Sequence, residues 1–211
     1  MKYLFIGAHA DDIEIGCGGT LLKAYKNNQI FNYIATNSEY SDENGKLVRT
    51  ELNAKKDIQR CYRGKKIKNI IGNSKVFYLD NNEELRSELV RLKKRIMPSV
   101  VFLPWINDPH PDHKNLAEAA LTVFKDSDNI LMYRSNWYYS INHLNKNFYS
   151  DITSSYKYKI KMLLNFKSEM NRTKSTWIKK IENESISNGS MINKKYAETF
   201  EIVKLSDAFK I

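Results

Sequence analysis

Residues 3–12 read Tyr3-Leu4-Phe5-Ile6-Gly7-Ala8-His9-Ala10-Asp11-Asp12. A short apolar run that ends in a glycine predicts a buried β-strand, and three ionisable side chains follow where this strand ends. In open α/β sheets, ligands bind outside the carboxyl ends of the strands. Because three ionisable groups so close together suit a binding site better than a core, we predict that this loop carries the active site.

A second segment has the same layout about a hundred residues later. The apolar run 100–103 leads into a loop rich in proline, which ends in the sequence His-Pro-Asp-His at 110–113. If the two strands are parallel neighbours, His9, Asp12 and His113 would supply two imidazoles and one carboxylate at one edge of the sheet. Such a set leaves the open position that a catalytic zinc site needs. It also suits non-haem Fe(II), so the ligand types leave the choice between Zn²⁺ and Fe²⁺ open.

The rest of the chain alternates between apolar runs and amphipathic segments. The expected strands are residues 3–6, 30–36, 75–79, 100–103 and 130–133, and the expected helices are 11–28, 47–61, 82–95 and 112–125. Strands that alternate with helices favour a parallel sheet with right-handed crossovers. The predicted fold class is therefore α/β, with a mostly parallel sheet flanked by helices.

The remainder of the sequence is less regular. Residues 157–168 and 175–184 have helical patterns, and residues 196–205 alternate as a strand does. An aromatic-rich region at 137–149 could line a sugar pocket or simply pack in the core. The length of 211 residues fits a single domain over residues 1–211.

Glycines at positions 16, 18 and 19 lie inside the expected first helix. They would weaken a helix, so they indicate that its backbone approaches a neighbouring element or a ligand closely. A dinucleotide-binding fingerprint is an alternative, but it needs a third glycine at position 21, where the chain has leucine.

The composition argues against a nucleic-acid-binding, a membrane-spanning and a disulfide-rich protein. The net charge of +10 raises nucleic acid as a partner, but the lysines are scattered in pairs rather than gathered in a stripe, so we expect no nucleic-acid binding. We see no signal peptide and no run long enough to span a membrane, and the two cysteines provide no disulfide framework. These features predict a cytoplasmic protein with a small-molecule substrate; whether it forms a homo-oligomer is left open.

Arg49 is a candidate substrate-binding residue. It lies with Glu51 in the first turn of the expected helix 47–61, where it could clamp a hydroxyl, carboxylate or phosphate group. The alternative is an arginine on a solvated helix face.

With these two motifs, the sequence resembles the PIG-L/LmbE-type metal-dependent de-N-acetylases. Family members begin with a strand, the motif Ala-His-Pro-Asp-Asp and a glycine-rich helix start, and this chain has Ala-His-Ala-Asp-Asp at 8–12 and Gly-Cys-Gly-Gly-Thr at 16–20. The second family motif, His-Pro-Asp-His, is intact at 110–113. The resemblance implies a Rossmann-like, three-layer α/β/α fold. It also implies removal of acetyl groups from N-acetylglucosamine-type sugars on diverse carriers.

The resemblance also implies roles for the individual residues. His9, Asp12 and His113 would bind zinc, and Asp11 would be the general base. His110, held by Asp112, would be the protonated group that stabilises the oxyanion or helps the amine to leave. One departure from the pattern is Ala10, which replaces a proline and could loosen the loop.

Each role has a simpler alternative. Asp11 or Asp12 could merely cap the following helix, because Asp is a favoured N-cap residue. Capping explains neither His9 nor the histidines of the second loop, whereas the fourth histidine, His143, is expected at the surface. The favoured function is zinc-dependent removal of the N-acetyl group from an amino-sugar conjugate. The alternative is a non-catalytic carbohydrate-binding relative with the same fold.

Overall fold

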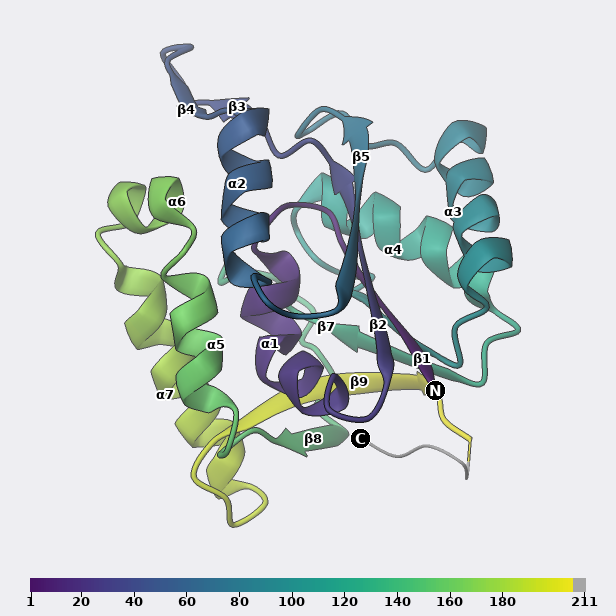
Figure 1. Ribbon diagram of the computed structural model, residues 1–211, viewed down its shortest axis with the longest axis vertical. Helices are drawn as coiled ribbons and strands as arrows, with labels where there is room; N and C mark the ends of the chain where they lie inside the picture. Colours follow the sequence, from purple (N-terminus) through teal and green to yellow (C-terminus); the bar gives the residue numbers. More distant parts are fainter. Residues whose placement is uncertain (207–211) are drawn as a thin grey trace.

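The computed structural model describes residues 1–206, which form a seven-stranded sheet between two layers of helices (Figure 1). The strands are β1 (Lys2–Gly7), β2 (Gln29–Thr36), β3 (Tyr40–Ser41), β4 (Leu47–Arg49), β5 (Ile67–Ser74), β6 (Val100–Pro104), β7 (Asn129–Tyr133), β8 (Phe148–Asp151) and β9 (Ala197–Lys204). The helices are α1 (Asp12–Ala24), α2 (Glu51–Cys61), α3 (Glu83–Ile96), α4 (Pro111–Phe124), α5 (Tyr156–Leu163), α6 (Lys167–Arg172) and α7 (Thr176–Ser190).

The order of strands in the main sheet is β5-β2-β1-β6-β7-β9-β8, and β3 pairs with β4 in a separate small hairpin. Strands β5, β2, β1, β6 and β7 are parallel to their neighbours, and β9 runs antiparallel to both β7 and β8. The predicted α/β class is confirmed. Strand β1 lies between β2 and β6, so the strand order reverses at β1. At such a point the connections on the two sides of the sheet diverge, which opens a crevice at the carboxyl ends of β1 and β6.

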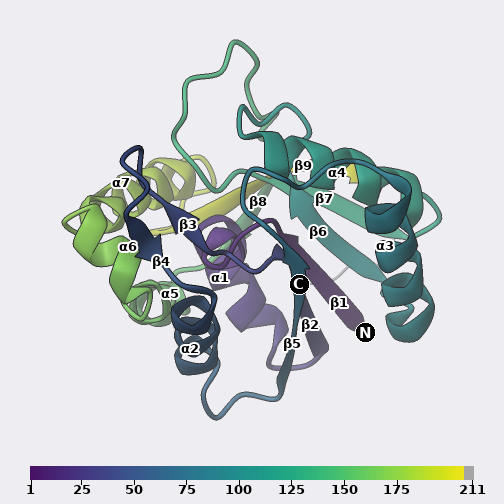
Figure 2. The same ribbon diagram turned by 90° about the horizontal axis from the view of Figure 1, so that it is seen from above.

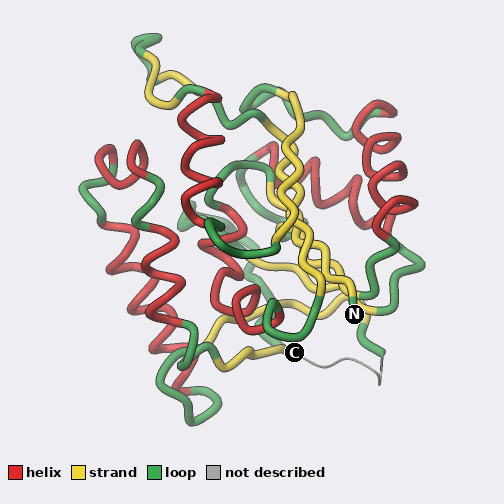
Figure 3. Tube along the Cα trace, in the orientation of Figure 1, coloured by secondary structure: helices red, strands yellow, loops and turns green. Residues whose placement is uncertain are grey.

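The unbroken apolar run of β1 follows from its burial on both faces. Tyr3 and Phe5 pack in the core with side chains of α1, α2 and α5, whereas Leu4 and Ile6 pack in the core with side chains of α3 and α4. Figure 2 shows α1 and α2 on the side of the sheet opposite to α3 and α4, and the tube in Figure 3 shows the strands between these groups. The first loop therefore starts from a strand that is buried on both faces.

Helix α1 is kinked, and side chains from α5 and β9 bond to the backbone groups that the kink leaves without helical partners. Cys17 has non-helical backbone angles (φ −142°, ψ 17°), which breaks the helical ladder of hydrogen bonds. The Glu198 carboxylate accepts hydrogen bonds from the backbone N–H groups of Gly19 (2.8 Å) and Thr20 (2.7 Å). The Lys159 ammonium donates to the Ile15 carbonyl oxygen (2.7 Å) and to Glu198 (2.6 Å). A buried ion pair thus satisfies backbone groups that a kinked helix leaves open.

The predicted close approach at the glycine-rich segment is found at Gly16. A Cβ atom on Gly16 would lie 2.0 Å from Cδ2 of Tyr133, whereas on Gly18 its nearest neighbour would be 3.5 Å away. We expect Gly16→Ala to lower the free energy of unfolding by about 1–3 kcal/mol through overpacking. Gly18→Ala, the control in the same helix, should leave it unchanged or raise it by up to about 1 kcal/mol. Urea unfolding measures both, and equal stability of the two variants would contradict this account of α1.

Two predictions of secondary structure before β6 are wrong. Residues 75–79 were expected as a strand but form a loop, and the strand is β5 at 67–74. Phe77 in this loop has a φ of 70°, a left-handed conformation that does not belong to a strand, and its N–H bonds to the Asp112 carboxylate (2.8 Å). The predicted helix at 47–61 begins only at Glu51, because residues 47–49 form β4, which pairs with β3.

The region after β7 contains more elements than the sequence indicates. Strand β8 was not predicted, and the segment expected as one helix over residues 157–168 is instead α5, followed by a break and the start of α6. The strand expected at 196–205 is β9. None of the helices formed by residues 1–206 has the length and apolar character needed to cross a bilayer.

Candidate metal centre

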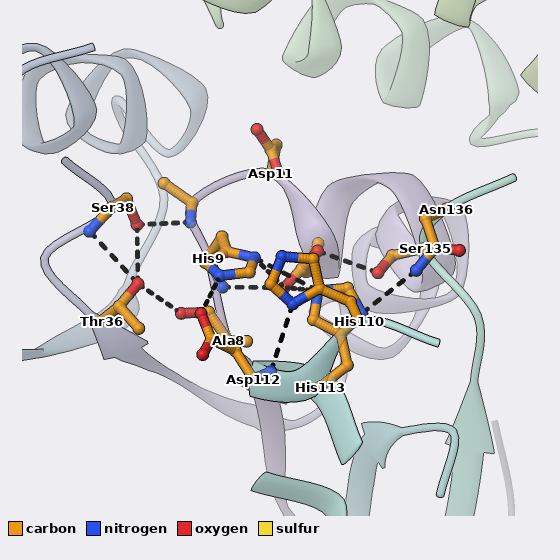
Figure 4. A network of polar contacts seen from close by, with 12 residues as sticks. Ala8, His9, Asp11, Thr36, Ser38, His110, Asp112, His113, Ser135 and Asn136 are labelled. Carbon is orange, nitrogen blue, oxygen red and sulfur yellow. Dashed lines mark hydrogen bonds and ion pairs between the residues drawn. The ribbon is translucent and has the colours of Figure 1, made fainter. Parts of the chain in front are cut away.

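The two polar loops meet at the carboxyl ends of neighbouring strands. Asp11 and Asp12 follow β1, and His110 and His113 follow β6, which pairs with β1 in parallel. Figure 4 shows the imidazoles of His9, His110 and His113 gathered together, with Asp11 to one side. These five side chains line one cavity of about 310 Å³. The predicted juxtaposition of the two loops is therefore present in the fold.

Three ligand-type atoms converge at the base of this cavity. Oδ2 of Asp12 lies 3.6 Å from Nδ1 of His9 and 3.2 Å from Nε2 of His113, and the two nitrogens are 3.2 Å apart. Metal–ligand bonds of about 2.1 Å in a tetrahedral zinc site place ligand atoms about 3.4 Å apart. The three atoms thus fit a zinc-sized ion. His110 belongs to a looser set of three imidazoles whose nitrogens lie within 4.8 Å of one another.

Further side chains hold these atoms in place. Nε2 of His9 donates to Oδ2 of Asp112 (2.8 Å), which leaves Nδ1 facing Asp12 and His113. Nδ1 of His113 lies 3.2 Å from Oδ2 of Asp108, and the Ser135 hydroxyl donates to the other oxygen of Asp12 (2.9 Å). Metal-binding histidines in proteins usually donate their second ring N–H to a carboxylate, a backbone carbonyl or water, and here the partners are carboxylates.

The charge of the site also fits a cation. Burial alone would lower the pKa of His113, but the carboxylates of Asp12 and Asp108 outweigh burial and raise this pKa to about 10. Burial would raise the pKa of Asp12, yet the neighbouring His113 and His9 hold it well below its usual range. An excess of buried carboxylate thus surrounds His113, and a divalent cation would balance it.

The carboxylate of Asp112 provides a test of this arrangement. We expect Asp112→Asn to weaken the affinity for Zn²⁺ by about 10–100-fold, because an amide oxygen would no longer fix the orientation and basicity of His9. Competition with a chromogenic zinc chelator measures the affinity. Asp80→Asn, in the exposed loop that Asp112 contacts, is the matched control and should leave the affinity unchanged. An unchanged affinity in the Asp112 variant would show that Asp112 does not support His9.

The predicted pairing of Asp112 with His110 is wrong. The Asp112 carboxylate contacts His9 and the backbone N–H groups of Phe77 and Leu79, and only its own backbone N–H reaches His110, at Nδ1 (3.2 Å). Burial and the neighbouring imidazoles lower the pKa of His110 to about 4. His110 is therefore a neutral imidazole, and because Nδ1 accepts a hydrogen bond, Nε2 carries the proton.

Asp11 is held in a strained backbone conformation. Its φ is 111°, and it occupies the N-cap position of α1 without a capping hydrogen bond from its side chain. The carboxylate instead accepts a hydrogen bond from Nη1 of Arg49 (2.9 Å). Burial raises the pKa of the Asp11 carboxyl well above its usual value, although Arg49 acts in the opposite direction. The simple capping role is thus excluded for Asp11, and its strain is of the kind found at functional sites.

Ala10 does not leave the loop loose. Its backbone N–H, which a proline would lack, donates to the hydroxyl of Ser38 (2.8 Å), and its carbonyl oxygen accepts from Arg49 (3.0 Å). Ser38 in turn accepts from Arg49 through its own carbonyl oxygen (2.9 Å). These hydrogen bonds hold the backbone of the loop in place, as the fixed φ of a proline would.

Arg49 lies at the end of β4 and is 3% exposed, not on a solvated helix face. Its hydrogen bonds go to Asp11, Ala10 and Ser38, so it positions the loop after β1; a direct contact with substrate stays a prediction. Glu51 pairs with Lys55 at the start of α2.

Sequence reasoning missed several residues of the site. They are Tyr40, Asp108, Ser135, Asn136, Glu169 and Arg172. Asp108 carries a local signal, because an Asp two residues before a backbone N–H forms the turn seen here with His110 (2.9 Å). Ser135 and Asn136 carry the same signal as the two motifs, because they follow β7 at the carboxyl edge of the sheet. Tyr40, Glu169 and Arg172 lie on distant segments and carry no signal of their own.

Known proteins resemble this chain in sequence. The sequence model of PIG-L, described as GlcNAc-PI de-N-acetylase, matches residues 4–124. The diacetylchitobiose deacetylase of Thermococcus kodakarensis is 28% identical over 125 residues, which cover 54% of this chain and 45% of that protein. The chain therefore matches less than half the length of this curated relative.

Solved structures share the fold at lower identity. The N,N'-diacetylchitobiose deacetylase of Pyrococcus horikoshii, complexed with an inhibitor, has a TM-score of 0.80 at 22% identity, over 96% of this chain and 83% of that one. GalB, a 4-carboxy-2-hydroxymuconate hydratase from Pseudomonas putida, has a TM-score of 0.76 at 13% identity, over 100% of both chains. Since this fold serves a deacetylase and a hydratase, the reaction must be argued from the site.

Proposed function

This chain belongs to the PIG-L family of GlcNAc-PI de-N-acetylases, and we propose that it is a zinc-dependent hydrolase of an N-acetylglucosamine-type amino-sugar conjugate. The observation that carries the proposal is the convergence of His9 Nδ1, Asp12 Oδ2 and His113 Nε2 within 3.2–3.6 Å of one another. Asp11 and His110 line the same cavity, so an acid–base group and a neutral hydrogen-bond donor lie beside the three ligand atoms.

His9, Asp12 and His113 would hold the ion, with Fe²⁺ as the alternative to Zn²⁺ because both accept this ligand set. A zinc ion there would lower the pKa of a water molecule to about 7 and polarise the carbonyl of the acetamide. The carboxylates of Asp112 and Asp108 keep His9 and His113 oriented toward it.

The remaining steps fall to Asp11 and His110. Asp11 accepts a proton from the water that adds to the carbonyl carbon, and passes it to the nitrogen as the carbon–nitrogen bond breaks. Burial raises the pKa of the Asp11 carboxyl above its usual value, and a carboxylate with a higher pKa is a stronger base. The Nε2–H of His110 donates a hydrogen bond to the oxygen that becomes negative in the tetrahedral intermediate. The products are acetate and a free amino sugar.

The test is acetate release by the zinc-loaded protein from a panel of N-acetylglucosamine conjugates. The panel contains the methyl glycoside, the 1-phosphate, a disaccharide and a nucleotide-linked sugar. We expect acetate and free amine to appear in equal amounts from at least one of them. Release of neither product from any conjugate, with either Zn²⁺ or Fe²⁺ supplied, would favour the non-catalytic carbohydrate-binding alternative.

A further inference from the structure

Of the three imidazoles in the cavity, that of His110 has the fewest polar contacts. The His9 ring bonds to the Asp112 carboxylate (2.8 Å), and the His113 ring lies 3.2 Å from the Asp108 carboxylate. Within residues 1–206 the His110 ring has one hydrogen bond, which its Nδ1 accepts from the backbone N–H of Asp112 (3.2 Å). Because this bond is at the long end of the usual range, it resists rotation of the ring only weakly.

Two aromatic rings lie against this imidazole. The Phe77 ring is 5.0 Å from the His110 ring with an angle of 19° between the planes, and the Tyr138 ring is 6.3 Å away with an angle of 16°. Nearly parallel rings at these distances form offset-stacked pairs. Phe77 belongs to the loop before α3 and Tyr138 to the loop after β7, and both line the cavity. Two distant segments thus bring a ring to the same imidazole.

Packing in the core does not account for these two side chains. Phe77 is 62% exposed and Tyr138 is 57% exposed. Each has an aromatic neighbour in the chain, Tyr78 and Tyr139, which is more exposed still. In the part of the chain that the structure describes, neither neighbour lines the cavity or stacks on His110. The contact with His110 is therefore what distinguishes Phe77 and Tyr138 from the residues next to them.

Backbone hydrogen bonds hold both rings in place. Phe77 has a φ of 70°, and its N–H donates to the Asp112 carboxylate (2.8 Å). The N–H of Tyr138 donates to the side-chain oxygen of Asn136 (3.2 Å), and its carbonyl oxygen accepts from Arg134. These bonds involve the backbone of Phe77 and Tyr138, so a substitution of either side chain removes the ring and leaves its anchor intact.

Aromatic rings suit the role that His110 has in the proposed reaction. A carboxylate beside the ring, like those beside His9 and His113, would favour the positively charged imidazole. A stacked ring restricts the orientation of an imidazole without adding a charge. His110 can thus be held in one direction and still act as a neutral N–H donor.

We propose that Phe77 and Tyr138 are positioning residues, whose rings fix the imidazole of His110 with its Nε2–H directed at the oxygen that becomes negative during the reaction. This inference rests on the proposed function, because it concerns the hydrogen-bond donor of that reaction. The two rings act through His110 and not through contact with the sugar.

The kinetic test is acetate release by zinc-loaded Phe77→Ala. We expect kcat to fall by about 10–100-fold with KM within about twofold of the wild type, because the misdirected donor is lost mainly in the transition state. Tyr138→Ala should lower kcat by about tenfold, since its ring is the more distant at 6.3 Å. Zinc content should stay at the wild-type level in both variants, as the Phe77 N–H still supports Asp112.

Conservative and neighbouring variants are the matched controls. Phe77→Tyr and Tyr138→Phe keep an aromatic ring and should retain kcat within about twofold of the wild type. Tyr78→Ala and Tyr139→Ala each remove an exposed ring one residue away and should leave kcat and KM unchanged. A rise in KM at constant kcat in Phe77→Ala would overturn the inference, because the ring would then bind the sugar. A loss of zinc together with activity would also overturn it, because the ring would then support the metal ligands.

The nitrogen signals of the His110 ring provide a measurement without turnover. The chain has four histidines, so the signal missing from a long-range ¹H–¹⁵N spectrum of His110→Gln assigns His110. The zinc-loaded wild type should show a neutral imidazole with the proton on Nε2. In Phe77→Ala the shifts of the two ring nitrogens should move toward each other, because a loosened ring exchanges between tautomers. Tyr78→Ala should leave both shifts unchanged.

These spectra separate this inference from the proposed function. If no conjugate releases acetate but the ring nitrogens respond to Phe77→Ala and not to Tyr78→Ala, the hydrolase proposal fails and the positioning of His110 stands. If acetate is released and Phe77→Ala changes neither kcat nor the nitrogen shifts, the positioning role fails and the hydrolase proposal stands.

Discussion

Replacing Asp11 by asparagine is expected to lower kcat by about 10²–10⁴-fold while the protein keeps its metal. The amide retains an oxygen for the hydrogen bond from Arg49, which spans 2.9 Å, so the strained loop should keep its shape. What the variant loses is a group that can accept a proton from water and return it to the amine. The measurement is kcat for acetate release, alongside metal content by atomic absorption.

Asp12→Asn is the matched control for this variant, because the two carboxylates are adjacent but face different partners. Oδ2 of Asp12 lies 3.2 Å from Nε2 of His113, so this variant should lose metal together with activity. A kcat for Asp11→Asn within a few fold of the wild type would remove Asp11 from the reaction.

The second large effect is expected from His113→Ala, which should reduce bound zinc from about one ion per chain to background and acetate release with it. His113 supplies one of the three converging atoms, and it lies between the carboxylates of Asp12 and Asp108 at 3.2 Å from each. Without His113 only His9 and Asp12 would remain as ligands, and two protein ligands do not retain zinc against a chelator.

Two further variants make the His113 result interpretable. His143→Ala removes the exposed histidine outside the cavity and should leave metal content and activity unchanged. His113→Gln keeps a polar side chain between the two carboxylates, in case the alanine variant does not fold. Full zinc content in a folded His113 variant would show that the ion is held elsewhere.

The central strands were predictable because burial on both faces leaves an unmistakable pattern. β1 and β6 are continuous apolar runs, and each ends where a polar loop begins. Edge strand β5 was missed for the opposite reason. It is half exposed and carries Lys68 and Asn69, whereas the more apolar run 75–79 is a loop that packs beside the site.

The two loops of the site were predictable for a related reason. His9 follows β1 directly and His113 follows β6 after a loop that leads into α4, and the parallel pairing of β1 with β6 puts both at one edge of the sheet. The contacts that hold the imidazoles could not be assigned in this way. The carboxylate of Asp112 bonds to His9 rather than to the ring of its near neighbour His110, and this choice depends on the directions of side chains, which spacing does not reveal.

The part of the cavity lining that comes from α6, α7 and the loop after β7 could not be predicted from the sequence. Glu169 and Lys180 belong to helices whose patterns look like ordinary solvated surface, and Trp137 lies in a loop whose aromatic residues suggested either packing or sugar binding. Only the tertiary arrangement places Glu169 3.7 Å from Arg49, more than a hundred residues earlier in the chain.

The most direct measurement is a metal titration of the chelator-treated protein, followed by acetate release from the conjugate that the panel identifies as the best substrate. The account predicts no acetate from the metal-free protein and a linear rise in rate with added Zn²⁺ or Fe²⁺, which ends at about one ion per chain. Full activity in the metal-free protein would contradict it.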